Sequence, residues 1–262
     1  MSRPVVLIVP GAAALAELYK TFIKAVSEKG YEIEALTLPS VRNAAEANVT
    51  PPTMYEDAAA IQSRVAKLAD AGKDVILLPH SYGGTPSTQS VEGLSKKERE
   101  AKGLPGGIIG LAYMTCLIPE LGQPAMSVQA SMAPEDKVPM EINEHGWIYF
   151  PSIPRLAELS FTDMPKEQGE YWAAKLANHS SASFASPLTY QGFKDVPVSY
   201  LVCEHDLTIP PVLQQAGIDM IERITGEKVE VTRIDSDHCA PASDMQKVVD
   251  WIVNVVNRFE TA

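Results

Sequence analysis

The sequence predicts an α/β fold in which a mainly parallel sheet is doubly wound, with helices on both of its faces. Aliphatic runs alternate with amphipathic helical patterns up to about residue 114 and again from about residue 198. This alternation is typical of parallel strands joined by right-handed crossovers. The first aliphatic run, Val5–Val9, lacks polar residues at every second position, which indicates a strand covered on both faces.

The first half of the chain supplies four predicted strands and two clear helices. The strands are expected at Val5–Val9, Ile33–Leu38, Val75–Leu78 and Ile108–Met114. Apolar residues recur at three- and four-residue spacing from Leu15 to Val26, which predicts a helix that stops at Gly30. Thr53 and Glu56 have capping-box spacing and predict a second helix over Thr53–Ala71.

The segment 119–187 breaks this alternation. It is rich in proline, methionine and aromatic residues, and a helix is expected from Pro165 to Asn178. Insertions of this length in a sheet fold usually cover the strand ends. We therefore expect a helical cap at 119–187 between two parts of one folded core, 1–118 and 188–262, with Trp147 and Tyr149 of the cap contacting a substrate.

The sheet is expected to resume after the cap. Strands are predicted at Val198–Cys203 and Val229–Ile234, with a helix from Pro210 or Pro211 through Ile224 between them. The final helix is expected to begin at Ser243, because Gln246 stands at capping-box spacing from it and a strong apolar stripe follows.

Composition excludes several classes of partner. The net charge of −11 over 262 residues and the absence of any basic run argue against nucleic acid and against an anionic membrane surface. Pro10 and Gly11 interrupt the first apolar stretch, so we interpret it as a strand rather than a signal peptide. Three cysteines without metal-ligand spacing predict free thiols in the cytoplasm, with no metal and no cofactor; a homodimer is left open.

The stretch His80-Ser81-Tyr82-Gly83-Gly84 follows the third predicted strand and has the form of a nucleophile elbow. In this turn a strand leads directly into a helix and presents a strained serine above the sheet. Side chains at the two glycines would collide with neighbouring backbone. The pattern departs from G-x-S-x-G at its first position, where Pro79 replaces glycine.

A serine nucleophile needs a base and an acid, which in this architecture follow it in the order serine, acid, histidine. Asp206 follows the strand that ends at Cys203, and His238 follows the strand that ends at Ile234. We therefore predict Ser81, Asp206 and His238 as the catalytic residues. Glu204 is an alternative to Asp206, while Asp235 and Asp237 are expected to be solvated loop residues.

An acyl-transfer site also needs amide donors for the oxyanion. The amide of Tyr82, the residue after the nucleophile, is one candidate, and the turn after the first strand supplies the other. We expect this second donor at Ala12, with Ala13 as the alternative. Ala13 and His80 are also expected beside the substrate.

With these motifs in place, nearly the whole chain resembles the α/β-hydrolase superfamily. It is most similar to the small single-domain branch that includes plant methyl-ester esterases, hydroxynitrile lyases and their fungal and bacterial relatives. The resemblance rests on Pro10-Gly11-Ala12, the elbow, the stretch Pro197–Asp206 and His238. It implies the α/β-hydrolase fold and the same site residues. Cys239 stands where the hydroxynitrile lyases carry a lysine, so cyanohydrin cleavage is disfavoured.

These observations lead to the hypothesis of a serine hydrolase that cleaves a carboxylic ester or lactone of a small, neutral and fairly apolar molecule through an acyl-enzyme. Two rivals remain. The same site can serve lyase, cyclase or C–C bond chemistry in small-molecule biosynthesis, because a fold does not determine its reaction. Alternatively, the chain binds a ligand without turning it over.

Overall fold

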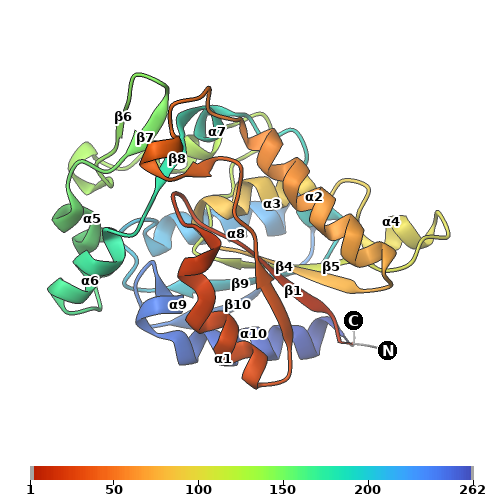
Figure 1. The fold of residues 1–262 in the computed structure, drawn as a ribbon. Helices are drawn as coiled ribbons and strands as arrows, with labels where there is room; N and C mark the ends of the chain where they lie inside the picture. Colours follow the sequence, from red (N-terminus) through yellow and green to blue (C-terminus); the bar gives the residue numbers. More distant parts are fainter. Residues whose placement is uncertain (1–2, 261–262) are drawn as a thin grey trace.

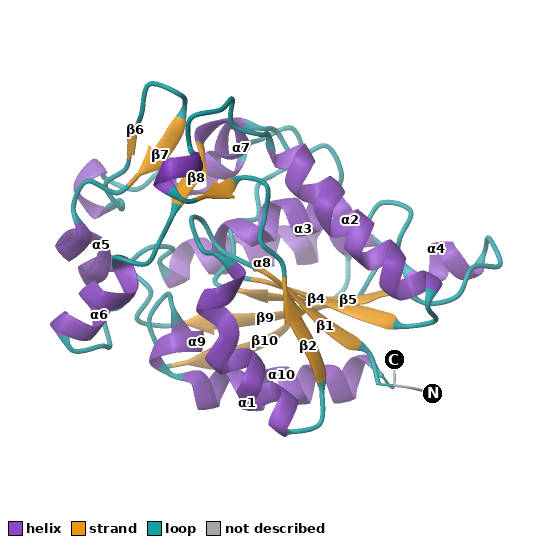
Figure 2. Ribbon diagram, viewed as in Figure 1, coloured by secondary structure: helices purple, strands orange, loops and turns teal. Residues whose placement is uncertain are grey.

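The central element of the fold is a six-stranded sheet. In the computed structural model, which describes residues 3–260, its strands are all parallel and lie in the order β10-β9-β5-β4-β1-β2. They are β1 (Val5–Val9), β2 (Glu32–Ala35), β4 (Asp74–Pro79), β5 (Gly107–Met114), β9 (Val198–Cys203) and β10 (Glu230–Ile234). Figures 1 and 2 show helices above and below this sheet, which confirms the predicted fold class.

Alternate residues of the strands face two separate apolar cores. Val5 and Leu7 of β1 are buried in one core with α2 (Met54–Asp70) and α8 (Pro211–Thr225), and α3 (Gly84–Ser90) contacts α2. Val6 and Ile8 are buried in the other core with α1 (Lys20–Glu28) and α10 (Met245–Phe259). Because both faces are covered, every residue of β1 is apolar and buried.

Apart from α5, α6 and α7 of the segment 119–187, which are described below, the remaining helices are short. They are α4 (Lys96–Glu100), α9 (Ala240–Ser243) and the 3-10 turns Ala16–Tyr19, Ala44–Glu46, Ser81–Gly83, Ala125–Gln129, Pro134–Asp136 and Gly192–Lys194. The predicted capping box of α2 is confirmed, since Thr53 and Glu56 satisfy each other's backbone amides. Within residues 3–260, no helix has both the length and the apolar character that crossing a bilayer requires.

The segment 119–187 forms a mixed structure rather than a purely helical one. Its elements are β6 (Glu141–Ile142), β7 (Trp147–Tyr149), α5 (Ile153–Ser160), α6 (Lys166–Ala173), β8 (Asn178–Ser180) and α7 (Ser181–Ala185). Together with β3 (Val41–Arg42), its strands build a small antiparallel sheet in the order β3-β8-β7-β6. Figure 1 shows these elements gathered at one end of the central sheet.

Two predicted helix boundaries are wrong for tertiary reasons. Helix α6 ends at Ala173 instead of Asn178, because the amide of Ala177 donates to Ala13 O at 2.8 Å and the chain then enters β8. Helix α10 begins at Met245, with no side-chain cap. Ser243 does not cap it, because its hydroxyl donates to Asp237 instead.

Candidate active site

Ser81 stands at the tip of a strained turn between β4 and α3. Its φ of +54° lies in the left-handed region, which is uncommon for a residue with a side chain. The turn brings the backbone so close to its neighbours that a Cβ at Gly83 would lie 2.3 Å from Val9 O, and one at Gly84 would lie 2.7 Å from Cys116 Cβ. Both glycines are therefore required by the geometry of the elbow.

Pro79 is accommodated without loss of this geometry. It is the last residue of β4 and is paired with Val9 of β1. The hydrogen bonding to β1 continues beyond it, since the amide of His80 donates to Val9 O at 3.0 Å. The proline therefore occupies a position where the strand is about to end and the turn begins.

The structure brings Ser81, His238 and Asp206 together in one hydrogen-bonded row. Nδ1 of His238 lies 2.8 Å from Asp206 Oδ2, and Nε2 lies 2.9 Å from Ser81 Oγ. An ionised carboxylate only accepts hydrogen bonds, so Nδ1 carries the proton and Nε2 accepts the serine hydroxyl. This is the arrangement in which an imidazole can remove a proton from serine.

The carboxylate of Asp206 is fixed in orientation by its own loop. Its Oδ1 accepts the amides of Thr208 at 2.8 Å and Ile209 at 2.7 Å, and Gln214 Nε2 lies 3.2 Å from Oδ2. Asp206 is fully buried. The alternative acid, Glu204, instead forms an ion pair with Arg233 at 2.8 Å on the surface.

The amides expected to bind an oxyanion are available. Ala12 lines the cavity onto which Ser81 opens. Its N–H and that of Tyr82 have no hydrogen-bond acceptor among the described residues. The alternative donor is excluded, because the amide of Ala13 donates to His179 Nδ1 at 3.1 Å.

A second buried network connects Gly11, in the turn after β1, to the loop of His238. His80 Nε2 lies 2.8 Å from the carbonyl of His238, so it must donate, and Nδ1 then accepts the hydroxyl of Tyr19 at 2.7 Å. The Tyr19 oxygen accepts the amide of Gly11 at 3.3 Å. Burial lowers the pKa of His80 to about 3, which keeps its ring neutral. A neutral ring carries one N–H, so Nε2 donates and Nδ1 accepts.

The side chain of Tyr82 is held behind the elbow. Its hydroxyl donates to Asp57 Oδ2 at 2.7 Å, while Asp57 Oδ1 accepts the amide of Ser40 at 2.9 Å. Burial raises the pKa of Asp57 to about 6, and the Tyr82 and Ser40 hydrogen bonds partly counter this. The ring of Tyr82 packs edge-on against His179 of β8 with a centroid distance of 4.5 Å.

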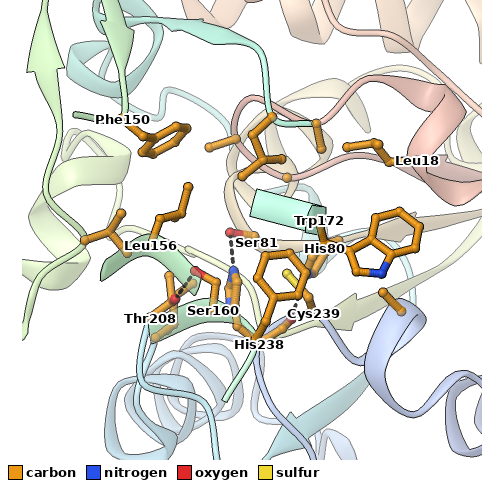
Figure 3. A pocket seen from close by; sticks show the side chains of 18 of the residues that line it. Leu18, His80, Ser81, Phe150, Leu156, Ser160, Trp172, Thr208, His238 and Cys239 are labelled. Carbon is orange, nitrogen blue, oxygen red and sulfur yellow. Dashed lines mark hydrogen bonds between the residues drawn. The ribbon is translucent and has the colours of Figure 1, made fainter. Parts of the chain in front are cut away.

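Ser81 and His238 open into a cavity of about 250 Å³ (Figure 3). The cavity is formed jointly by the core loops and the cap. Its lining includes Leu18, Tyr19, His80, Phe150, Leu156, Ser160, Phe161, Trp172, Leu176 and Thr208. Most of these side chains are apolar, and the cap supplies Phe150, Leu156, Trp172 and Leu176.

Of the residues expected to contact substrate, only His80 lines this cavity among the described residues. Ala13 is turned toward His179, as described above. Trp147 is fully buried, and its indole nitrogen donates to Val49 O at 2.7 Å. The hydroxyl of Tyr149 bonds to Glu141. The expectation that Ala13, Trp147 and Tyr149 contact the substrate is therefore corrected, since none of them lines the cavity. In β7, Trp147 is buried, whereas the hydroxyl of Tyr149 lies at the surface beside Glu141.

The sequence analysis missed other residues of the site. Phe150 directly follows β7, and Trp172 lies on α6; both belong to the aromatic residues of the cap, but no spacing distinguished them from packing residues. Asp237 was expected to be solvated but is buried. Its carboxylate accepts hydrogen bonds from the amides of Asp163 and Cys239 and from the hydroxyl of Ser243. Within residues 3–260, no group of three or more His, Cys, Asp or Glu is placed to hold a metal ion.

Comparisons with known proteins identify the family and agree with the fold. Residues 6–251 match the model of the alpha/beta hydrolase family. The chain is 31% identical over 255 residues to the probable hydrolase R7 of a Phoma species, covering 97% of this chain and 99% of that one. A pyrethroid hydrolase from Sphingobium faniae is 16% identical with a TM-score of 0.73 and 98% of each chain covered. Polyneuridine aldehyde esterase is 15% identical, also with a TM-score of 0.73, over 97% of this chain and 99% of that one. The resemblance inferred from the motifs is thus confirmed, and the chain belongs to the alpha/beta hydrolase family.

Proposed function

We propose that this protein is a serine hydrolase that cleaves a carboxylic ester or lactone of a small, fairly apolar molecule through an acyl-enzyme. The observation that carries the proposal is the hydrogen-bonded row of Ser81, His238 and Asp206 at the base of an apolar cavity. A serine hydroxyl is a weak nucleophile at neutral pH unless such a base removes its proton.

In the proposed mechanism, Ser81 Oγ attacks the carbonyl carbon while its proton moves to His238 Nε2. Asp206 stabilises the resulting imidazolium through Nδ1–H and keeps the ring oriented. His238 then donates the proton to the departing alcohol oxygen, which leaves an acyl group on Ser81. Water, deprotonated by His238, attacks this ester and releases the acid and the free serine.

The amides of Ala12 and Tyr82 are the proposed donors to the oxyanion. Both N–H groups lack an acceptor within the described chain. Backbone donors of this kind stabilise negative charge that develops in the transition state, and loss of one typically costs about 10²- to 10³-fold in rate.

The apolar lining supports the substrate class. The cavity volume of about 250 Å³ suits a small molecule, and the cap side chains around it are aromatic and aliphatic. The names of two similar structures, a pyrethroid hydrolase and polyneuridine aldehyde esterase, are consistent with ester chemistry in this fold.

The test is turnover of a panel of small esters and lactones in ¹⁸O-labelled water by the wild type and by Ser81→Ala. We expect hydrolysis by the wild type, with one labelled oxygen in the product acid, and a loss of at least about 10³-fold in the variant. Undiminished turnover by folded Ser81→Ala contradicts the mechanism. Product without labelled oxygen supports the rival lyase or cyclase chemistry, and tight ligand binding without turnover supports a binding protein.

A further inference from the structure

One side of the otherwise apolar cavity carries hydroxyl groups. Ser160, the last residue of α5, and Thr208, in the loop of Asp206, both line the cavity. Figure 3 shows them beside His238, on the side of Leu156, with Trp172 on the other side. Their oxygens lie 2.9 Å apart, and Ser160 is only 4% exposed.

These hydroxyls are coupled to the catalytic loops through the backbone. The amide of Thr208 donates to Asp206 Oδ1 at 2.8 Å, and Gln129 Nε2 donates to Thr208 O at 2.6 Å. The carbonyl of Ser160 accepts the amide of Cys239, which follows His238, at 3.2 Å. The end of α5 is therefore held against both the acid loop and the histidine loop.

The hydrogen bonds determine which groups the cavity offers to a ligand. Thr208 Oγ1 donates its single proton to Leu159 O at 3.1 Å, a carbonyl at the end of α5 that has no partner within the helix. In the arrangement that satisfies this carbonyl, Ser160 donates its own proton to Thr208 Oγ1. Its remaining lone pairs accept no hydrogen bond from the described residues, so Ser160 Oγ faces the cavity as an acceptor alone.

We propose that Ser160 Oγ is a subsite for a substrate hydroxyl, so that the enzyme prefers hydroxylated esters or lactones over their deoxy counterparts. A buried acceptor left without a donor is costly, which makes it selective for a substrate that supplies one. A cationic donor does not fit, because the lining includes Lys137 but no described carboxylate. This inference rests on the proposed function and narrows its substrate class.

The test compares two matched series of esters of a six-carbon acid: methyl esters in which the acyl part varies, and esters in which a short alcohol part varies. Within each series the substrates differ only in whether the second or third carbon of the varied part carries a hydroxyl, a keto oxygen or only hydrogen. For at least one position we expect the wild type to show a kcat/KM about tenfold higher for the hydroxyl compound than for the other two. The keto compound is decisive, since it is polar but donates nothing.

Ser160→Ala should reduce this hydroxyl-to-deoxy ratio to about one. The ratio of the two kcat/KM values is the readout, because a change in packing caused by the substitution affects the hydroxyl and the deoxy substrate alike. Thr162→Val is the matched control: its hydroxyl ties the same end of α5 to the acid loop, at 3.1 Å from His205 O, but it does not line the cavity. It should retain the tenfold ratio.

The inference is wrong if the wild type shows no hydroxyl preference at any position, if keto compounds are favoured equally, or if the preference survives in Ser160→Ala. The first two outcomes need no variant, so a folding defect in Ser160→Ala leaves the inference testable. If the wild type hydrolyses none of the esters, the proposed function fails instead. Calorimetric binding of the same pairs to Ser81→Ala then tests the subsite alone, with a tenfold difference in Kd expected.

Discussion

Two acidic side chains, Glu204 and Asp206, lie in the loop after β9, but only Asp206 forms a hydrogen bond with His238. Asp206→Asn should lower kcat by about 10³- to 10⁴-fold, because an amide cannot both hold Nδ1–H and stabilise the imidazolium. Glu204→Gln, which only breaks the surface pair with Arg233, should change kcat by less than about twofold. Steady-state kinetics on one ester measures both variants, and a larger effect at Glu204 would reverse the assignment.

Tyr19 is a positioning residue in this account. Tyr19→Phe leaves His80 Nδ1 and the amide of Gly11 without their partner, so we expect kcat to fall about tenfold while KM stays within about twofold. The affinity for a boronic acid, which imitates the tetrahedral intermediate, should fall by the same factor as kcat/KM.

Tyr31→Phe is the matched control for Tyr19→Phe. It removes a hydroxyl that donates to Asn257 Oδ1 at 3.1 Å on a residue that does not line the cavity, and it should leave kcat unchanged. If Tyr19→Phe alters only thermal stability, with kcat per active site intact, Tyr19 serves packing and not the positioning of the site.

At the scale of the elements, two glycines should respond to alanine in opposite directions. A Cβ at Gly83 would lie 2.3 Å from Val9 O and 2.7 Å from Pro10 O, so Gly83→Ala should lower the free energy of unfolding by about 1–3 kcal/mol. Gly217 lies within α8, with its nearest neighbour, Ile118 Cβ, at 3.9 Å, and Gly217→Ala should raise that free energy by about 0.5–1 kcal/mol.

Urea unfolding of both glycine variants checks this pair. Equal effects of the two substitutions would contradict the close approach of the elbow to β1. A displaced Ser81 in Gly83→Ala should also slow its reaction with a serine-directed probe, whereas Gly217→Ala should react at the wild-type rate.

The sequence predicted the elements of the central sheet well because their signals are local. Val5–Val9 matches β1 residue for residue, since a strand buried on both faces is an uninterrupted aliphatic run. Val198–Cys203 also matches β9, although Ser199 and Tyr200 stand within it. The order of Ser81, Asp206 and His238 followed from which loops succeed which strands. The capping box expected at Ser243 failed, because Asp237 competes for the same hydroxyl through a tertiary contact.

The cap was predictable as a segment but not in its packing. Trp147 and Phe150 have equal aromatic character in the sequence, and only the pairing of β7 with β8 decides that Trp147 is buried under Val49 while Phe150 lines the cavity. Tyr19 and Ser160 could not be recognised either, because their partners lie 61 and 48 residues away.

For the whole molecule, buried titratable groups make stability depend on pH. Burial lowers the pKa of His80 and of His179 from 6.5 to about 3, so their contribution is complete above pH 6.5 and is lost as the pH falls toward 3. Burial raises the pKa of Asp57 from 3.8 to about 6, so its contribution is present at low pH and lost as the pH rises through 6.

The histidines outweigh Asp57 in this balance. Between pH 7 and pH 5 we expect the free energy of unfolding to fall by about 3 kcal/mol. His179→Gln should reduce this fall by about 2 kcal/mol. Denaturant unfolding at the two pH values measures the difference. An unchanged fall in His179→Gln would show that His179 is not held neutral in the folded protein.

The central claim is that this fold activates Ser81. Its most direct test is reaction of the wild type and of Ser81→Ala with a fluorophosphonate, followed by mass spectrometry of the labelled peptide. We predict a single adduct on Ser81 that is absent from the variant, because only a serine deprotonated by His238 attacks the phosphorus rapidly. A folded wild-type protein that stays unlabelled, or that is labelled at another residue, would contradict the claim.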